Sequence, residues 1–263
     1  MSFYFELIKK SFKKSFIYRA NSYTNILAAI IQLVIQISIW MSLYGTNTVH
    51  NGISISAMIT FVVITRIVMS LTNSTVGGKI SEKINQGTIA IDFVKPINMR
   101  WAYFAEDLGS NLYNLLFTIT PICIITILFI DIIIPKDFST TILFIISIVL
   151  GVILMYYIHY VLGLCCFWLE SCWGIDFLKQ GLMELFGGTY VPLWYYPTIL
   201  YNVSVFLPFR YICFDPIQMY IQNYSPKKCM LVLGCQFFWI LILIIVERVV
   251  YKLARKRLSI VGG

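Results

Sequence analysis

Two apolar runs constrain this chain more than any other feature. Residues 54–72 and 112–130 are each long enough to cross a lipid bilayer as a helix, and a polar stretch, residues 77–100, lies between them. The chain is 59% hydrophobic and only 12% charged, whereas soluble domains are about one quarter charged. Such a chain lacks the polar residues to cover a water-facing surface. The sequence therefore predicts an all-α polytopic membrane protein.

Hydrophobic segments predict six transmembrane helices within a single membrane domain, residues 1–263. The six helices are expected at residues 23–44, 53–73, 111–130, 140–168, 173–191 and 229–246. Residues 192–228 contain four of the eight prolines, and their apolar pieces are too short to cross, so we expect re-entrant or interfacial helices there. With both termini in the cytoplasm, fifteen Lys and Arg residues lie inside and four outside, which agrees with the positive-inside rule.

The first twenty residues have the pattern of an amphipathic helix. Phe5, Ile8, Phe12 and Phe16 recur on one face, and four lysines occupy the other. We expect residues 1–20 to lie in the cytoplasmic headgroup layer, with the apolar side against membrane lipid. Because the basic residues gather at the ends of spans, the net charge of +8 indicates a membrane topology and no nucleic-acid partner.

The polar stretch, residues 77–100, has helix signals of its own. Residues 81–86 are expected to be helical, Gly87 to end that helix, and Pro96 to end whatever follows. A compact, charged element in a cytoplasmic loop suits contact with a partner, and we expect this one to receive force from a separate ATPase. The residues assigned to this coupling are Ile80, Ser81, Glu82, Lys83, Ile84 and Gln86.

The sequence offers little catalytic chemistry. Its one P-loop-like string fails, because Asn73 stands where the first glycine belongs and Ile80 where Ser or Thr must follow the lysine. His159 stands alone in the fourth predicted span, so neither a metal site nor an enzyme is expected. The seven cysteines are expected to be packing residues, with a Cys213–Cys229 disulfide left open.

Two ionisable residues fall inside predicted spans. Arg66 lies in the second span and Glu184 in the fifth, and a lone charge in lipid costs on the order of 3 kcal/mol. Their expected depths are similar, so three arrangements are open: a direct ion pair, a shared polar cavity, or separate partners for each residue. In every case polar contacts must offset the cost of the charge.

Short motifs occur in order along nearly the whole chain. They are Tyr18-Arg19-Ala20-Asn21, Arg66 with Ser70-Leu71-Thr72, Gly87-Thr88 through Lys95-Pro96-Ile97-Asn98, Asp107-Leu108-Gly109, Phe167-Trp168 with Trp173-Gly174, Pro192-Leu193, Pro208-Phe209 and Gly262-Gly263. Taken together, the motifs resemble the bacterial permease subunits of ATP-binding-cassette (ABC) exporters of the type V, ABC-2-like fold.

That resemblance implies two permeases, like or unlike, in a bacterial cytoplasmic membrane, clamped by two ATPase domains on separate chains. ATP and Mg²⁺ would belong to those domains, and this chain would bind no cofactor. The resemblance also implies a coupling helix at residues 81–86. The second and fifth spans would line the translocation path, which assigns Arg66, Ser70 and Glu184 to it.

The expected function is outward transport of an amphipathic compound, lipid or peptide, as in multidrug or peptide efflux. One alternative is a secondary transporter driven by an ion gradient, which would need an internal repeat with paired broken helices. The other is a non-transporting membrane anchor or sensor, which would need no structured coupling loop. Residues 192–228 are richer in Tyr and Phe than the family pattern, so the outer gate and the substrate stay open.

Overall fold

The chain is almost entirely helical in the part that the structure describes. The computed structural model covers residues 2–17, 19–46, 49–50, 52–129, 132–135, 137–169, 173–221 and 224–261. One short antiparallel hairpin, β1 (Val49–His50) with β2 (Ile53–Ser54), interrupts the helices. The predicted all-α class is therefore confirmed. The motifs and the charge count also include Tyr18, Lys136, Gly262 and Gly263, and these lie outside the described residues.

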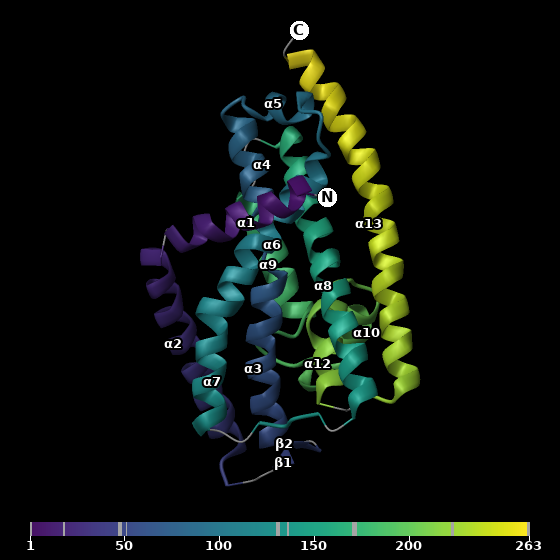
Figure 1. Ribbon diagram of the computed structural model, residues 1–263. Helices are drawn as coiled ribbons and strands as arrows, with labels where there is room; N and C mark the ends of the chain where they lie inside the picture. Colours follow the sequence, from purple (N-terminus) through teal and green to yellow (C-terminus); the bar gives the residue numbers. More distant parts are fainter. Residues whose placement is uncertain are drawn as a thin grey trace.

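Four helical stretches of the described chain are long and apolar enough, by length and composition, to cross a membrane. They are Ile26–Tyr44, Ile55–Asn85, Phe138–Trp168 and Pro226–Arg257. The helices involved are α2 (Arg19–Tyr44), α3 (Ile55–Thr72), α4 (Val76–Asn85), α8 (Phe138–Cys165), the short η2 (Cys166–Trp168) and α13 (Pro226–Val261). These stretches correspond to the first, second, fourth and sixth predicted spans. With 36 residues, α13 is about 54 Å long and continues well past its predicted span, to the C-terminal end at the top of Figure 1.

The third and fifth predicted spans are less regular. At the third, a π-helical stretch, η1 (Leu115–Ile119), joins α6 (Met99–Asn114) to α7 (Thr120–Phe129). At the fifth, α9 (Trp173–Phe186) has only 14 residues, about 21 Å of helix against a hydrocarbon core of about 30 Å. It ends before residue 191 because Gly188 turns the chain with φ +67°. The helices agree with a membrane protein, and the count of six spans stays a prediction.

Of residues 192–228, those before the start of α13 at Pro226 form only short helices where the structure describes them. These are η3 (Leu193–Tyr195), α10 (Thr198–Val205), α11 (Phe209–Ile212) and α12 (Phe214–Tyr220). Each is too short to cross a bilayer, and α11 and α12 pack on α8. Cys213 and Cys229 are both buried and free, so the structure contains no disulfide between them. Cys166, the first residue of η2, is disulfide-bonded.

A buried ion pair holds this compact segment together. Arg210 donates to Asp215 twice, from Nε to Oδ2 at 2.9 Å and from Nη2 to Oδ1 at 2.9 Å. Tyr224 donates to Oδ1 of the same carboxylate at 2.7 Å. Both charged side chains are buried, so each depends on the other to offset its lost hydration.

Helix α8 forms the centre of the structure and packs against α13, α4 and α12. In the N-terminal half of α8, Gln236 of α13 donates from Nε2 to the carbonyl oxygen of Ser147 at 3.0 Å and accepts from the Ser147 hydroxyl at 3.0 Å. All of these groups are buried. The reciprocal pair fixes α13 to α8, which lie side by side in Figure 1.

The N-terminal helix α1 (Ser2–Ile17) lies across α6, which partly covers Ile8 and Phe12 of its apolar side. A Cβ atom at Gly109 would collide with the carbonyl oxygen of Ile8 and would lie 2.8 Å from the Cβ of Ser11. The absence of a side chain at Gly109 therefore lets the two helices touch. The Phe12 ring packs on Tyr113 at 5.8 Å between centroids. Phe5 and Phe16 of the predicted apolar face stay exposed, and the expectation that this face rests on lipid stays a prediction.

Candidate functional site

The polar stretch between α3 and α6 folds into two helices, α4 and α5 (Ile89–Val94), at the end of the molecule where the C-terminus also lies (Figure 1). We call residues 76–95 the island. The predicted helix at residues 81–86 is the second half of α4, which begins earlier, at Val76. Gly87 ends it as predicted, with φ +69°.

The first half of α4 is fixed to α8 by contact between the two backbones. A Cβ at Gly163 would lie 3.0 Å from Cα of Gly77 and 3.2 Å from Cδ1 of Ile80. Ile80 is fully buried in this crossing. Since neither glycine has a side chain, the helix axes approach more closely than most residue pairs allow.

Asp107 of α6 holds the N-terminus of α4. Its carboxylate accepts hydrogen bonds from the Ser74 hydroxyl, from the Thr75 hydroxyl at 3.1 Å and from the Thr75 backbone nitrogen at 3.4 Å. Lys79 lies 3.6 Å from the same carboxylate and 3.2 Å from Glu106. A carboxylate is favourable at a helix N-terminus, where backbone N–H groups lack partners. This contact explains why α4 begins before the predicted residue 81.

Asp92 of α5 joins the remaining elements of the island. Its carboxylate accepts from Lys83 of α4 at 2.5 Å, from Lys95 at 2.8 Å and from the Tyr103 hydroxyl of α6 at 2.6 Å. Burial alone would raise the pKa of this carboxyl, but the three hydrogen bonds outweigh burial and lower its pKa to about 2. The carboxylate is therefore charged at neutral pH and ties α4, α5 and α6 together.

The predicted coupling residues divide into anchors and exposed positions. Ile80 is buried, and Ser81, Lys83 and Ile84 are half-buried against the chain itself. Glu82 and Gln86 are exposed, and they bond each other at 3.0 Å. Ile80 and Ile84, both assigned to coupling, pack with the chain's own core.

The island has an exposed apolar tip, Ile91 and Val94, that was not predicted from the sequence. Ile91 is 58% exposed and Val94 83% exposed, and they lie three residues apart on α5. Residues with this spacing share a helix face. Two adjacent apolar side chains exposed outside any predicted span are a feature of partner contacts. The available signal was the segment Ile89–Val94 of the polar loop, which is apolar at every position except Asp92.

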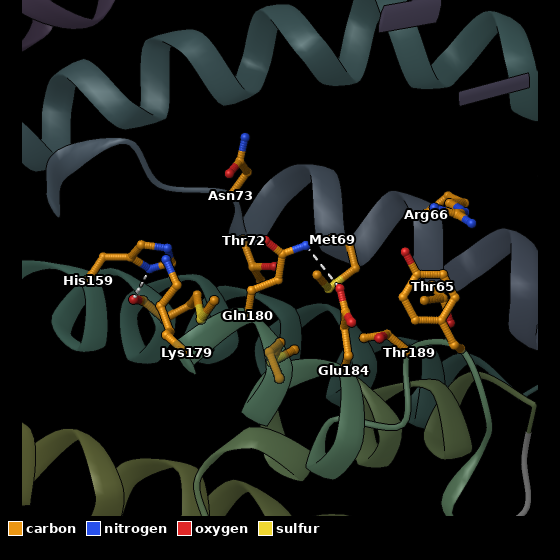
Figure 2. Close-up of a pocket in the computed structure, with 13 residues that line it drawn as sticks. Thr65, Arg66, Met69, Thr72, Asn73, His159, Lys179, Gln180, Glu184 and Thr189 are labelled. Carbon is orange, nitrogen blue, oxygen red and sulfur yellow. Dashed lines mark hydrogen bonds between the residues drawn. The ribbon is translucent and has the colours of Figure 1, made fainter. Parts of the chain in front are cut away.

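A cavity of about 290 Å³ lies between α3, α8 and α9. Arg66 and Glu184 both line it, but they do not bond each other (Figure 2). Glu184 accepts from Gln180 of its own helix at 2.9 Å. Arg66 donates to Gln32 at 3.0 Å and to Gln36 at 2.8 Å, both on α2. Of the three arrangements that the sequence left open, the structure has the shared cavity without the direct ion pair.

The remaining predicted residues are less central to this cavity. Ser70 is half-buried on α3 and does not belong to the lining. His159 lines the cavity as well, and its Nδ1 lies 2.9 Å from the carbonyl oxygen of Met155. Among the described residues, no three His, Cys, Asp or Glu side chains gather as metal ligands. The two glutamines on α2 were missed, although two amides four residues apart in an apolar span were a readable signal.

Comparison with known proteins gives one result for almost the entire chain. The sequence model of a family described as "ABC-2 family transporter protein" matches residues 26–262. No curated protein matches the sequence. The matched region begins within α2 and includes the island, the cavity beside Arg66 and nearly all of α13.

Proposed function

The chain belongs to the ABC-2 transporter family, and we propose that it is the permease subunit of an ATP-driven exporter. Members of this family are membrane-spanning components that work with ABC ATPase subunits and are not themselves catalytic. The chain is accordingly a multi-pass membrane protein and a permease component. The proposal adds six spans, cytoplasmic termini, a bacterial cytoplasmic membrane and outward movement of an amphipathic compound, lipid or peptide.

The observation that carries the proposal is the rigid island with an apolar tip. Asp107 and Asp92 fasten α4 and α5 to α6, and the contact at Gly163 fastens α4 to α8. Ile91 and Val94 then remain exposed at the far end. A loop that only joined two spans would need neither the internal network nor exposed apolar residues. An ATPase that pushes on this tip would move α8 directly.

The cavity between α3 and α9 supports a translocation path along these helices. Its lining mixes Arg66, Glu184 and Gln180 with Met69 and Met183, a combination suited to a compound with polar and apolar parts. A second permease, like or unlike, would complete the path. In this proposal ATP and Mg²⁺ belong to two partner ATPase domains, and this chain binds no cofactor.

The experiment is purification of the full-length chain from its own host cells, with two readouts. The first is the amount of ABC ATPase that remains bound, identified by its P-loop peptides, and the second is ATP hydrolysis. We expect Val94→Asp and Glu82→Arg to reduce bound ATPase roughly tenfold or more, as loss of a central interface contact does. The purified chain without its partner should hydrolyse no ATP.

Ile134→Asp is the matched control, because Ile134 is 73% exposed at the opposite end of the molecule. It should retain the ATPase at the wild-type level. If Val94→Asp and Ile134→Asp retain equal amounts of ATPase, the island is only a solvated linker between two helices. Robust hydrolysis by the isolated chain would overturn the permease assignment itself.

A further inference from the structure

A second cavity, of about 280 Å³, lies near the island end of the chain, between the start of α6 and the last third of α13. Its lining includes Arg100 from α6, Tyr160 from α8, and Glu247, Arg248, Tyr251 and Lys252 from α13. None of these residues lines the cavity beside Arg66. The proposed transport function therefore leaves this second cavity without a role.

The charge of the cavity is positive. Arg100 donates from Nη1 to Oε2 of Glu247 at 2.9 Å. Arg248 and Lys252 lie one turn apart on α13, and neither forms an ion pair with any side chain that the structure describes. The cavity thus has three cationic side chains, Arg100, Arg248 and Lys252, and one carboxylate, Glu247, which is already paired with Arg100. This cavity favours an anionic ligand.

Two buried donors in the cavity have no acceptor. The side chain of Tyr160 is fully buried, and its hydroxyl makes no hydrogen bond. The Nε atom of Arg100 is buried and likewise unpartnered. The Tyr160 ring is held in place by stacking on Tyr156, with centroids 5.8 Å apart. Buried donors in proteins nearly always have partners, because an unmade bond is costly. A ligand that supplies acceptors would remove this cost.

We propose that this cavity binds a phosphate group. Phosphate oxygens accept hydrogen bonds and carry negative charge, so they satisfy both the free donors and the excess of cations. An amine or a metal cation would meet donors and like charge instead.

The surroundings favour the headgroup of a phospholipid as the source of the phosphate. Val249 and Leu253 follow Arg248 and Lys252 on α13, and both are exposed apolar residues beside the cavity. They offer a surface for acyl chains where the apolar run of α13 changes to a basic one. Free phosphate has the same binding chemistry, so the experiment contains an arm for each source.

The test uses the full-length chain in detergent and measures its thermal unfolding midpoint, Tm. One arm titrates short-chain phosphatidylglycerol, and the other titrates inorganic phosphate against sodium chloride of equal ionic strength. The variants are Tyr160→Phe, which keeps the stacked ring, and Lys252→Gln, which is exposed. The control is Arg255→Gln, an exposed cation on the same helix that does not line the cavity.

The Tm of the wild type and of Arg255→Gln should rise as the lipid is added. Tyr160→Phe and Lys252→Gln should need a lipid concentration at least about tenfold higher for the same rise, because each loses one hydrogen bond to a charged group. A gain with phosphate as well would show that the free anion is also accepted. Without ligand, Tyr160→Phe should raise Tm, because it deletes an unpartnered buried hydroxyl.

The proposal is overturned if neither probe shifts Tm, or if Tyr160→Phe and Lys252→Gln respond like wild type. It also fails if Tyr160→Phe lowers the ligand-free Tm, since the hydroxyl would then already have a partner. All these measurements are made without an ATPase, so their outcome is independent of the permease assignment.

Discussion

The substitution Asp92→Asn tests whether the island behaves as one rigid element. It keeps the size of the side chain but removes the charge that Lys83, Lys95 and Tyr103 contact. In the wild type these contacts lower the pKa of the carboxyl from 3.8 to about 2, which corresponds to about 2 kcal/mol of stability at neutral pH. The side chains of the two lysines are 36% and 47% exposed, so solvent screening makes this value an upper bound.

The same shift sets the pH dependence of the island. Because the folded-state pKa of Asp92 lies below its unfolded value, its stabilisation is complete above about pH 5. It is lost as the pH falls from about 4 to about 2, where the folded carboxylate takes up a proton. The substituted island should lack this transition, since asparagine does not titrate.

Hydrogen–deuterium exchange of the full-length chain in a lipid nanodisc measures the effect locally. About 2 kcal/mol corresponds to a roughly 30-fold larger open population. The amides of α5 should therefore exchange up to roughly 30-fold faster in Asp92→Asn at neutral pH. Asp137→Asn is the matched control, because Asp137 caps α8 at the opposite end. Exchange within about threefold of wild type, under about 0.7 kcal/mol, would refute the claim that this network holds the island.

Three further substitutions test contacts elsewhere in the chain. Gly109→Val should push α1 off α6, because a side chain there collides with the Ile8 carbonyl; limited proteolysis should then cleave the first twenty residues faster, and an unchanged rate would contradict the contact. Asp215→Asn should lower stability by about 3–5 kcal/mol, because it leaves the buried Arg210 unpaired; thermal unfolding reads the loss, and an unchanged midpoint would mean that the pair is dispensable. Arg66→Ala should keep the ATPase bound but change how amphipathic compounds stimulate hydrolysis; loss of the ATPase would assign Arg66 to assembly instead.

Features with local causes could be predicted from the sequence. The stop at Gly87 needs only a residue that tolerates positive φ, and the structure has φ +69° there. The helices α3, α8 and α13 follow from apolar runs long enough to cross a bilayer. The irregular third span could not be read in this way, because the same apolar composition permits both an α-helix and the π-helical turn of η1.

Contacts between distant segments were beyond the sequence patterns. Arg66 signals a need for polar partners, but the pattern does not say that Gln32 and Gln36 of another helix supply them. Gly109 looks like any helical glycine until α1 is seen to cross it. Ile80 and Ile84 share a face as expected, yet only the tertiary packing shows that α8 covers Ile80.

The crossing of Gly77 and Gly163 determines how far α4 can shift relative to α8 when a force acts on the island. An interface made of side chains yields when its members change rotamer, and each change absorbs part of a displacement. Where backbone meets backbone there are no rotamers to change, so we expect α4 and the part of α8 around Gly163 to move together as one rigid unit. In the proposed function, a force applied at Val94 would pass through the contacts of Asp92 to α4 and from there, at the glycine crossing, to α8. The bonds between Ser147 and Gln236 would carry it on to α13.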